Sequence, residues 1–316
     1  MSRVPQVSVG LPVFQGEAYV DEAIRSIRNQ TLGDFELILS DNGSTDRTDE
    51  ICRAHASTDP RIAYHRSSRN RGAAWNFNRT FSLARGHYFK WMAHDDVILP
   101  DFLSRCVEIL DGSPDVVVAH TGVSRIDASG KEFKVLAPNH VAEGIDPVKR
   151  FSDMLLHDPA CKPVFGLIRR DVLARTGLLG TFNGHDRPLV AELALRGKFA
   201  QIPDVLFLNR EHAARSMRAY RTPSERIEWF DPALAGRPAY RHWRLALEYH
   251  RAIRRAASSH TVALRAEVCL GAWAFKYRRA LVSELLLRLG IRYRPRRRRS
   301  VQADAETGAQ STRLDS

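Results

Sequence analysis

Short runs of apolar residues alternate with helical patterns through the first 120 residues of the chain. In the helical stretches, apolar residues recur every three or four positions, as Val20, Ile24 and Ile27 do before the stop signal Gly33. The short runs are bounded by turn residues and predict five strands, at residues 7–13, 35–40, 62–65, 88–92 and 116–120. This alternation is typical of a parallel sheet with crossover helices.

The pattern changes beyond residue 125. Asp127-Ala128-Ser129-Gly130 predicts a hairpin turn. Further apolar runs predict strands at residues 165–168, 199–202 and 205–208. Earlier in the chain, Ser44 or Thr45 is suited to capping a helix that runs to about His55.

The C-terminal quarter differs from the rest in composition. Residues 240–290 nearly lack glycine and proline and predict helices, whereas residues 295–316 lack apolar periodicity and are expected to be disordered. A boundary near Pro232, Gly236 and Pro238 therefore divides the chain into a large domain, a helical segment and a tail. We place these parts at residues 1–236, 237–294 and 295–316.

Charge is distributed unevenly along the chain. The net charge of +12 comes from 48 basic and 36 acidic residues. Residues 237–299 hold 17 Lys and Arg against 3 Asp and Glu, while residues 1–236 hold 30 of each sign. The body is thus neutral, and the basic character belongs to the C-terminal segment.

Cysteine spacing and hydropathy bear on the cellular setting. The four cysteines lie far apart without a C-x-x-C pair, which gives neither a zinc spacing nor a disulfide framework. No signal peptide is expected in residues 1–15, and no stretch of 18 residues is free of charge. We therefore expect a protein of the reducing cytosol without a membrane span.

Acidic residues follow three of the predicted strands. They are Glu17, Asp41 and the pair Asp95-Asp96. Open α/β sheets bind ligands at the carboxyl edge of their strands, so these carboxylates are expected to converge on one crevice. Taken singly, Asp41 also suits a helix cap, and Asp95-Asp96 a solvated turn.

Several segments, taken together and in order, resemble family 2 glycosyltransferases. They are Val9-Gly10-Leu11-Pro12-Val13-Phe14, residues 35–46, Asn70-Arg71-Gly72 with Asn76, Asp95-Asp96 with Pro100, and later His185-Asp186 and residues 210–212. The resemblance implies an α/β protein of the GT-A type, with a Rossmann-like mixed sheet flanked by helices, here followed by a C-terminal helical appendage. Residues 1–125 would bind the nucleotide sugar and residues 126–236 the acceptor.

The resemblance also implies roles for individual residues on the donor side. The nucleotide pocket would include Pro12, Val13, Phe14, Glu17 and Asp41. The ribose and phosphates would lie near Asn70, Arg71, Gly72, Asn76 and Asp95. For Gly72 and Asn76 the alternative is a helix start and a turn.

A divalent cation, Mg²⁺ or Mn²⁺, is the cofactor that the resemblance implies. Asp95 and Asp96 are its candidate ligands, because such ions prefer oxygen donors and bridge a carboxylate to a diphosphate. Family members often carry an acid where this chain has Ala93. His212 resembles a late histidine that returns to the metal or phosphate; the alternative is a surface histidine.

Asp186 is the candidate general base. It stands at the start of a helix predicted over residues 187–196, where the family carries an acid. An acceptor hydroxyl must lose its proton as it attacks the anomeric carbon, and attack opposite the diphosphate inverts that carbon. The alternative role for Asp186 is a helix cap.

The resemblance therefore implies an inverting, hexosyltransferase-like enzyme with a nucleoside-diphosphate sugar donor and a hydroxyl acceptor. No Gln-x-x-Arg-Trp segment is present, which favours one transfer per encounter. A nucleotidyltransferase is one alternative, although the stretch from Gly10 to Gly16 lacks the Lys or Arg that its phosphate loop needs. A polyanion-binding protein is another, but no nucleic-acid motif accompanies the basic tail, so no specific nucleic acid is expected.

A helical stripe in the basic segment suggests a membrane partner. Its members recur every three or four residues: Val262, Ala266, Leu270, Trp273, Tyr277 and Leu281. With the polybasic run Arg296–Arg299 beyond it, the stripe predicts peripheral binding to an anionic membrane on its cytoplasmic face. A lipid-linked or membrane-proximal acceptor in envelope polysaccharide or glycolipid synthesis would agree with this location. The alternative is that the stripe packs against the catalytic body.

Overall fold

The structure, a computed structural model, describes residues 3–138, 142–156, 162–214, 219–220, 222–237, 240–289 and 291. The strands are β1 (Val7–Val13), β2 (Phe35–Asp41), β3 (Ile62–Arg66), β4 (Tyr88–Trp91), β5 (Val97–Ile98), β6 (Val116–Ile126), β7 (Glu132–Val135), β8 (Leu167–Arg169) and β9 (Lys198–Arg210). The helices of the first half are α1 (Val20–Arg28), α2 (Thr48–Thr58), α3 (Ala73–Leu83) and α4 (Phe102–Gly112). Those of the second half are α5 (Pro147–Leu156), α6 (Arg170–Leu173), α7 (Asp186–Arg196), α9 (Pro223–Phe230), α10 (Arg241–Ala256), α11 (His260–Lys276) and α12 (Arg278–Arg288).

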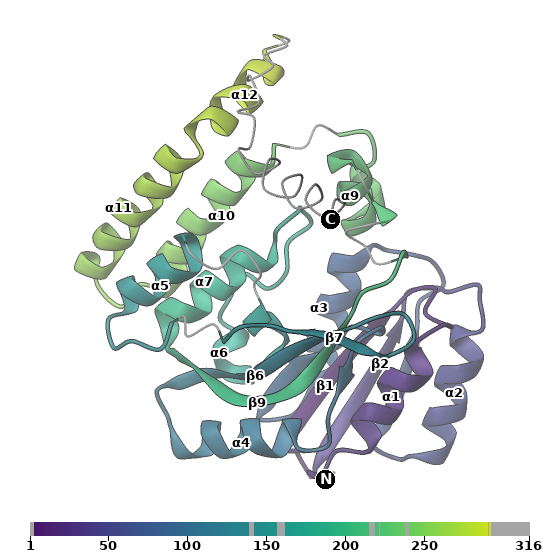
Figure 1. Cartoon of the computed structure of the whole chain (residues 1–316). Coiled ribbons are helices and arrows are strands. Elements are labelled where there is room, and N and C mark those ends of the chain that lie inside the picture. Colours follow the sequence, from purple (N-terminus) through teal and green to yellow (C-terminus); the bar gives the residue numbers. More distant parts are fainter. Residues whose placement is uncertain are drawn as a thin grey trace, which may run out of the picture.

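One mixed sheet runs through the molecule (Figure 1). Its strand order is β3-β2-β1-β4-β8-β6-β9-β5, and β7 pairs with β6 beside this path. Strands β1 to β4 are parallel, as their alternation with helices predicts. Strand β8 is antiparallel to both β4 and β6, and β6 is parallel to β9. The expected Rossmann-like mixed sheet is therefore confirmed.

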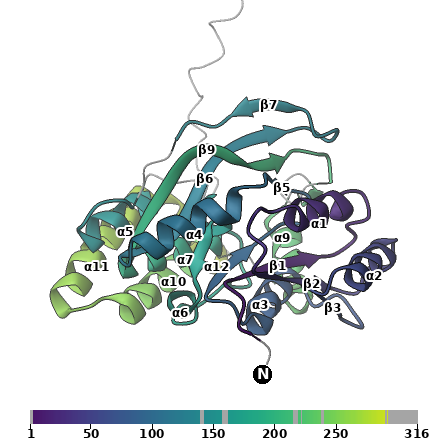
Figure 2. The same ribbon diagram turned by 90° about the horizontal axis from the view of Figure 1, so that it is seen from below.

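Buried side chains gather in two clusters, one on each face of the sheet. Strand β1 turns Val7, Val9 and Leu11 toward α1, α2 and α4, where all three are fully buried. On the other face, Phe89 and Trp91 of β4 pack with α3 and the later helices. Figure 2 shows α1 and α4 on one side of the sheet and α3 on the other.

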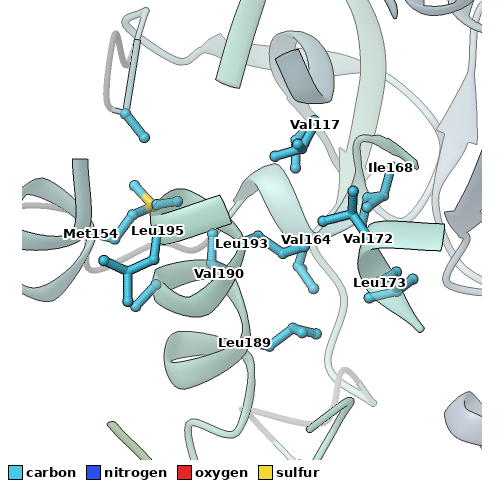
Figure 3. Packing of buried hydrophobic residues seen from close by; sticks show 14 of the residues in the cluster. Val117, Met154, Val164, Ile168, Val172, Leu173, Leu189, Val190, Leu193 and Leu195 are labelled. Carbon is cyan, nitrogen blue, oxygen red and sulfur yellow. The ribbon is translucent and has the colours of Figure 1, made fainter. Parts of the chain in front are cut away.

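Helix α7 is the centre of the second cluster. Its residues from Pro188 to Leu195 are all buried, which is expected for a helix that is apolar around most of its surface. Figure 3 shows Leu195 beside Met154 of α5, and Leu193 pointing toward Val164. This packing fixes the start of α7, where Asp186 stands.

Three expectations about local structure are wrong or shifted. The two strands expected at residues 199–202 and 205–208 are one strand, β9, because a bulge opposite Gly122 leaves Pro203 and Asp204 outside the ladder with β6. The strand expected at residues 165–168 is Leu167–Arg169. Neither Ser44 nor Thr45 caps α2, whose N-cap is Arg47, because the Ser44 hydroxyl accepts a hydrogen bond from the Gln15 N–H instead.

The C-terminal helices pack against the body. Within the expected stripe, Ala266, Leu270 and Trp273 are buried in the same cluster as α5 and α7. The Trp273 ring lies 5.5 Å from that of Tyr249, which in turn lies 6.4 Å from Phe151 of α5. The interpretation of this stripe as a membrane-binding face is therefore wrong, and the alternative of packing on the body holds.

The limits of the domains stay predictions. Helices α10 and α11 share their core with α5 and α7, so residues 237–294 do not form a separate core. The tail expected at residues 295–316 lies outside the described residues, as does Pro238. Among the helices that the structure describes, none is both long enough and apolar enough to cross a membrane.

Candidate functional site

The loop that follows β1 is held by the loop that precedes α2. The N–H of Gly16 donates to Thr48 Oγ1 at 2.8 Å, and the N–H of Arg47 donates to Glu17 Oε2 at 3.0 Å. Of the residues predicted to line the nucleotide pocket here, Pro12 and Val13 are buried, Phe14 is half-buried and Glu17 is exposed. The loop therefore presents Phe14 and Glu17 at the carboxyl edge of the sheet.

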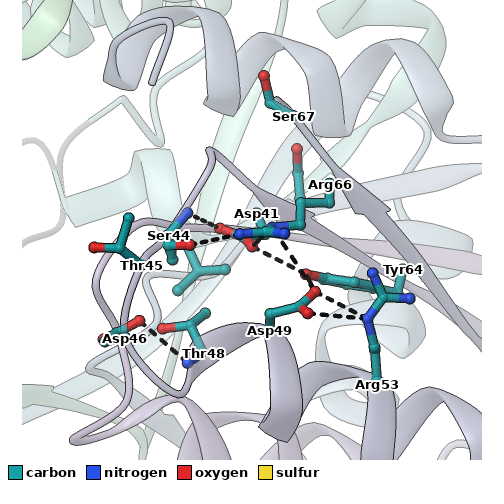
Figure 4. A network of polar contacts seen from close by, with 12 residues as sticks. Asp41, Ser44, Thr45, Asp46, Thr48, Asp49, Arg53, Tyr64, Arg66 and Ser67 are labelled. Atoms are coloured by element: carbon teal, nitrogen blue, oxygen red, sulfur yellow. Dashed lines mark hydrogen bonds and ion pairs between the residues drawn. The ribbon is translucent and has the colours of Figure 1, made fainter. Parts of the chain in front are cut away.

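Asp41 ends β2 with a fully buried carboxylate. Its Oδ1 accepts from the N–H of Ser44 at 2.9 Å. Its Oδ2 accepts from the Tyr64 hydroxyl at 2.9 Å and from Arg66 Nε at 3.2 Å (Figure 4). Burial and hydrogen bonds to the carboxylates of Asp49 and Asp41 raise the pKa of the Tyr64 hydroxyl, which keeps it a donor. Asp41 thus holds the strand end and the following turn in place.

Asn42 and Asn70 fasten the loop before α3 to the end of β2. Asn42 Nδ2 donates to Asn70 Oδ1 at 2.9 Å, and Asn42 Oδ1 accepts from the N–H of Arg71 at 3.0 Å. The guanidinium of Arg71 lies 4.7 Å from the centre of the Trp75 ring. This contact directs the exposed Arg71 side chain along α3.

Asn76 is a structural residue at the junction of two strands. Its Nδ2 donates to the carbonyl oxygens of Val13 and Ser40, at 3.2 and 2.9 Å, and its Oδ1 accepts from the Ser40 hydroxyl at 2.6 Å. With only 3% of its surface exposed, Asn76 ties the ends of β1 and β2 to α3. It supports the predicted pocket from beneath.

Gly72 and Phe230 connect the predicted donor side to the start of α7. Gly72 has φ of +88°, and a Cβ there would lie 2.3 Å from the carbonyl oxygen of Phe230. The Phe230 ring in turn lies edge-on to His185, with centroids 4.5 Å apart. A glycine at position 72 is therefore needed for the backbone of Phe230 to approach so closely. Asp186 is the next residue after His185, so this contact lies beside the candidate base.

His212 and Asp95 are brought together from distant parts of the chain. His212 Nε2 lies 2.9 Å from Asp95 Oδ2, and the His212 ring lies 4.7 Å from that of Tyr19. Burial by itself would raise the pKa of the Asp95 carboxyl. The hydrogen bond with His212 and the charges of His94 and His212 together outweigh this effect, so the pKa lies below its ordinary value. Asp95 is therefore ionised at neutral pH.

Asp96 has a different environment from Asp95. Asp96 as a whole is 2% exposed, and its Oδ1 accepts from Asn209 Nδ2 and from the N–H of Arg210, both at 2.9 Å. These contacts join the turn after β4 to the end of β9. Because the Asp96 carboxylate is engaged in these contacts, Asp95 is the better candidate for a direct ligand of the metal ion. The residue types alone do not distinguish the two aspartates.

Asp95 and His212 fit a divalent cation that takes part of its coordination from elsewhere. They offer one ionised carboxylate and one imidazole, and Mn²⁺ accepts both donor types more readily than Mg²⁺ does. Among the described residues, no cluster of three or more His, Cys, Asp or Glu could hold a metal by itself. The diphosphate of a ligand and water would have to supply the remaining positions.

Arg210 is a residue whose contacts the motifs did not predict. Its side chain is 1% exposed, and Nε donates to the Asp95 carbonyl oxygen at 2.9 Å. The same guanidinium forms an ion pair with Glu22 of α1 and lies 4.8 Å from the centre of the Tyr19 ring. Arg210 therefore positions both Asp95 and Tyr19. In the sequence, the one feature that pointed to Arg210 was its position two residues before His212.

Asp186 is the first residue of α7, and the cap position before it belongs to His185. No side chain caps the helix, and Asp186 Oδ1 accepts only from the N–H of the next residue, Arg187, at 3.1 Å among the hydrogen bonds of the described residues. Asp186 is therefore not the N-cap residue itself, although its carboxylate does bind one N–H of the first turn. Burial lowers the pKa of His185, which is neutral and has an unpaired Nδ1.

Known proteins resemble this chain in sequence. The model of the family described as glycosyl transferase family 2 matches residues 8–177, more than half of the chain. Chondroitin synthase of Escherichia coli is 31% identical over 130 residues, which cover 41% of this chain and 19% of that protein. An uncharacterized glycosyltransferase of Methanocaldococcus jannaschii is 33% identical over 135 residues, or 41% of this chain and 47% of its own. The chain thus spans less than half the length of these curated relatives.

The fold is also known from solved structures. The crystal structure of S. aureus TarS residues 1–349, in complex with UDP-GlcNAc, superposes with a TM-score of 0.54 at 14% sequence identity. The match covers 92% of this chain and 93% of that one. This likeness agrees with a GT-A type fold, and the family model identifies the chain as a member of glycosyltransferase family 2.

Proposed function

We propose that the chain transfers a sugar from a nucleoside-diphosphate donor to an acceptor hydroxyl, with inversion at the anomeric carbon and one transfer per encounter. The contact of 2.9 Å between Asp95 and His212 supports this most directly. It joins a carboxylate and an imidazole beside the loop after β1, at the edge where open α/β sheets bind ligands. The complex of TarS with UDP-GlcNAc agrees with a donor of this class.

The donor site is built from the loops after β1, β2 and β4. Phe14 and Glu17 are proposed to contact the nucleotide, while Asp41 and Asn76 hold the strand ends on which it rests. Arg71, in the exposed loop before α3, is proposed to contact phosphate oxygens. A divalent cation held by Asp95 and His212 would neutralise the charge of the departing diphosphate.

Asp186 is proposed as the general base. Its carboxylate has few hydrogen-bond partners among the described residues, which leaves an oxygen able to take the proton of the acceptor hydroxyl. Burial lowers the pKa of the neighbouring His185, which makes it a weaker base for that proton. Arg241 lies close enough for its charge to interact with that of the Asp186 carboxylate.

The acceptor is proposed to be a lipid-linked or membrane-proximal compound of cell-envelope polysaccharide or glycolipid synthesis. The basic character of residues 237–299 supports this setting, because it suits an anionic membrane on the cytoplasmic side. The acceptor half, residues 126–236, would bind it opposite the donor.

A panel of nucleotide sugars tests the proposal. The purified full chain, with Mn²⁺ or Mg²⁺, is expected to hydrolyse at least one of them slowly without acceptor, and addition of chelator should abolish this. Proton NMR of the first product then reads the anomeric configuration. Transfer of a nucleotidyl group with release of pyrophosphate, or a product that retains the donor's configuration, would contradict the proposal.

A further inference from the structure

Helices α11 and α12 carry an exposed apolar face on the side away from the body. Leu264, Val268 and Phe275 of α11 are 69%, 67% and 67% exposed. The face continues onto α12 through Val282 and Leu285 and ends at Leu289, the residue after this helix. Successive members lie 4, 7, 7, 3 and 4 residues apart, so they share one side of an almost continuous helix. We name these six residues the outer face.

The outer face is distinct from the buried stripe of the same helix. Ala266, Leu270 and Trp273 point into the core, whereas Leu264, Val268 and Phe275 point away from it. Figure 1 shows α11 and α12 along the outer edge of the molecule, with α10 on their inner side. Helix α11 is therefore apolar on two sides, and among the described residues only one of these sides packs into the core. A contiguous exposed stripe of this kind marks a contact surface, unlike single exposed apolar residues.

Basic side chains border the outer face. The guanidinium of Arg278 lies 4.2 Å from the centre of the Phe275 ring, and Arg279 is exposed next to Arg278 at the start of α12. The sequence continues beyond Ile291 with six arginines within residues 292–299. A surface that is apolar at its centre and cationic around it complements an anionic bilayer.

The acidic residues of this segment do not offset that charge at its surface. Residues 237–299 hold Glu248, Glu267 and Glu284. Each is already engaged within the helices: Glu284 with His242, Glu267 with His250, and Glu248 with Arg244 and Arg251. A second copy of the chain would bring the same excess of positive charge against the face, and the two copies would repel each other.

We infer that the outer face of α11 and α12 docks onto an anionic lipid bilayer, with the helices lying in the plane of its interface. Leu264, Val268 and Phe275 would enter the acyl boundary, and Arg278 and Arg279 would contact lipid phosphates. No helix in the described part of the chain could span the bilayer, so the contact is a surface contact. The docking does not depend on the proposed transfer reaction, and the two can be tested separately.

Vesicle flotation with the full chain tests the inference. The double variant V268D/F275D places two charges on the outer face, and F133D/V135D is its control, since Phe133 and Val135 of β7 are 56% and 61% exposed elsewhere on the molecule. Wild type and control are expected to float with phosphatidylglycerol-containing vesicles and not with pure phosphatidylcholine. The V268D/F275D variant should bind at least about tenfold more weakly, since it loses apolar burial and gains repulsion. High salt should weaken wild-type binding.

Three results would overturn the inference. One is flotation of V268D/F275D equal to that of the control, and another is equal binding of wild type to neutral and anionic vesicles. The third is a dimer in light scattering that V268D/F275D dissociates, without flotation of wild type, because a second copy would then cover the face. Thermal unfolding of both double variants checks the fold, and unchanged hydrolysis of the donor in V268D/F275D separates this result from failure of the proposed function.

Discussion

His212 Nε2 and Asp95 Oδ2 lie 2.9 Å apart although 117 residues separate them in the chain. The contact closes the turn after β4 against the end of β9, and Arg210 strengthens it by binding the Asp95 carbonyl oxygen. Two segments that the sequence presents separately thus form one unit at the carboxyl edge of the sheet. A change at His212 should therefore also affect Asp95.

We predict that His212→Ala lowers the affinity for Mn²⁺ and for the nucleotide diphosphate together. The loss should be about 10- to 100-fold, as when a metal ligand loses its partner or is itself removed. Isothermal titration calorimetry with and without metal measures both. The control is His87→Ala, because His87 is exposed at the opposite end of β4. Nucleotide affinity that is equal in the two variants would contradict a metal role for His212.

Asp186→Asn is predicted to keep donor binding and to lower transfer by at least about a hundredfold, the usual contribution of a general base. The amide is of nearly the same size, and the carboxylate makes few contacts, so the fold should be unaffected. Initial rates at saturating acceptor, with the KM for the donor measured in parallel, provide the test. Turnover close to that of wild type would remove Asp186 from this role.

Asp41 is predicted to contribute to stability as well as to the nucleotide pocket. Asp41→Ala removes the acceptor of the Ser44 N–H and one of the acceptors of Tyr64 and of Arg66, and this should cost about 1–3 kcal/mol of the free energy of unfolding. Tyr64 keeps its hydrogen bond to Asp49, and Arg66 keeps its hydrogen bond to the Ser44 carbonyl oxygen. Nucleotide binding should fall whichever sugar is attached. Urea unfolding and nucleotide titration separate the effects: a less stable variant with unchanged affinity would show that Asp41 acts only through the fold.

The arrangement of the first four strands could be predicted from sequence because each apolar run is short and is bounded by turns. The identity of the buried side of α11 could not, because Ala266 and Trp273 on one side and Val268 and Phe275 on the other are similarly apolar. Periodicity finds a helix but does not say which of two apolar sides meets the core. The side of α11 that is buried is the one on which Trp273 contacts Tyr249 of α10.

The same limit applies to the candidate site. The order of the motifs predicted which residues gather at the sheet edge, and Asp95 and His212 do meet there. The order did not predict that Asp96 would be buried against Asn209, or that Arg210 would span Asp95 and Glu22. These contacts depend on how β9 passes the turn after β4, which the local sequence does not encode.

Gly72→Ala is predicted to destabilise the junction between α3 and α9. The new Cβ would meet the Phe230 carbonyl oxygen at 2.3 Å, and the φ of +88° is unfavourable for alanine. Gly236→Ala is the control for a positive φ without a close contact, since its φ is +74° and nothing lies within 4 Å of its Cβ position. The control should lose roughly 1–2 kcal/mol through strain alone.

Gly72→Ala should lose more than the control, because the backbone of α9 must also move. Chemical denaturation of both variants gives the difference, and equal losses would show that close approach to Phe230 contributes nothing. The displacement should also disturb the contact between Phe230 and His185, so transfer should fall more than donor binding does.

Lys90 is predicted to make stability depend on pH. It is buried in β4 beneath the site, with its ammonium 4.1 Å from the centre of the Phe102 ring, and burial lowers its pKa to about 7. The unfolded chain holds the proton up to a pKa of about 10.4, so between these values the unfolded state binds more protons than the folded state does. The free energy of unfolding should therefore rise with pH, by up to about 1.4 kcal/mol per unit.

Lys90→Met isolates this contribution, because methionine fills similar space without a charge. Burial raises the pKa values of Cys52 and Cys106 to about 12, so both thiols oppose the rise at higher pH, where only the unfolded chain loses their protons. The measurement is therefore the difference in unfolding free energy between Lys90→Met and wild type from pH 7 to pH 8.5. Wild type should gain on the variant as the pH rises across this range. Parallel curves for the two proteins would mean that Lys90 keeps an ordinary pKa in the folded state.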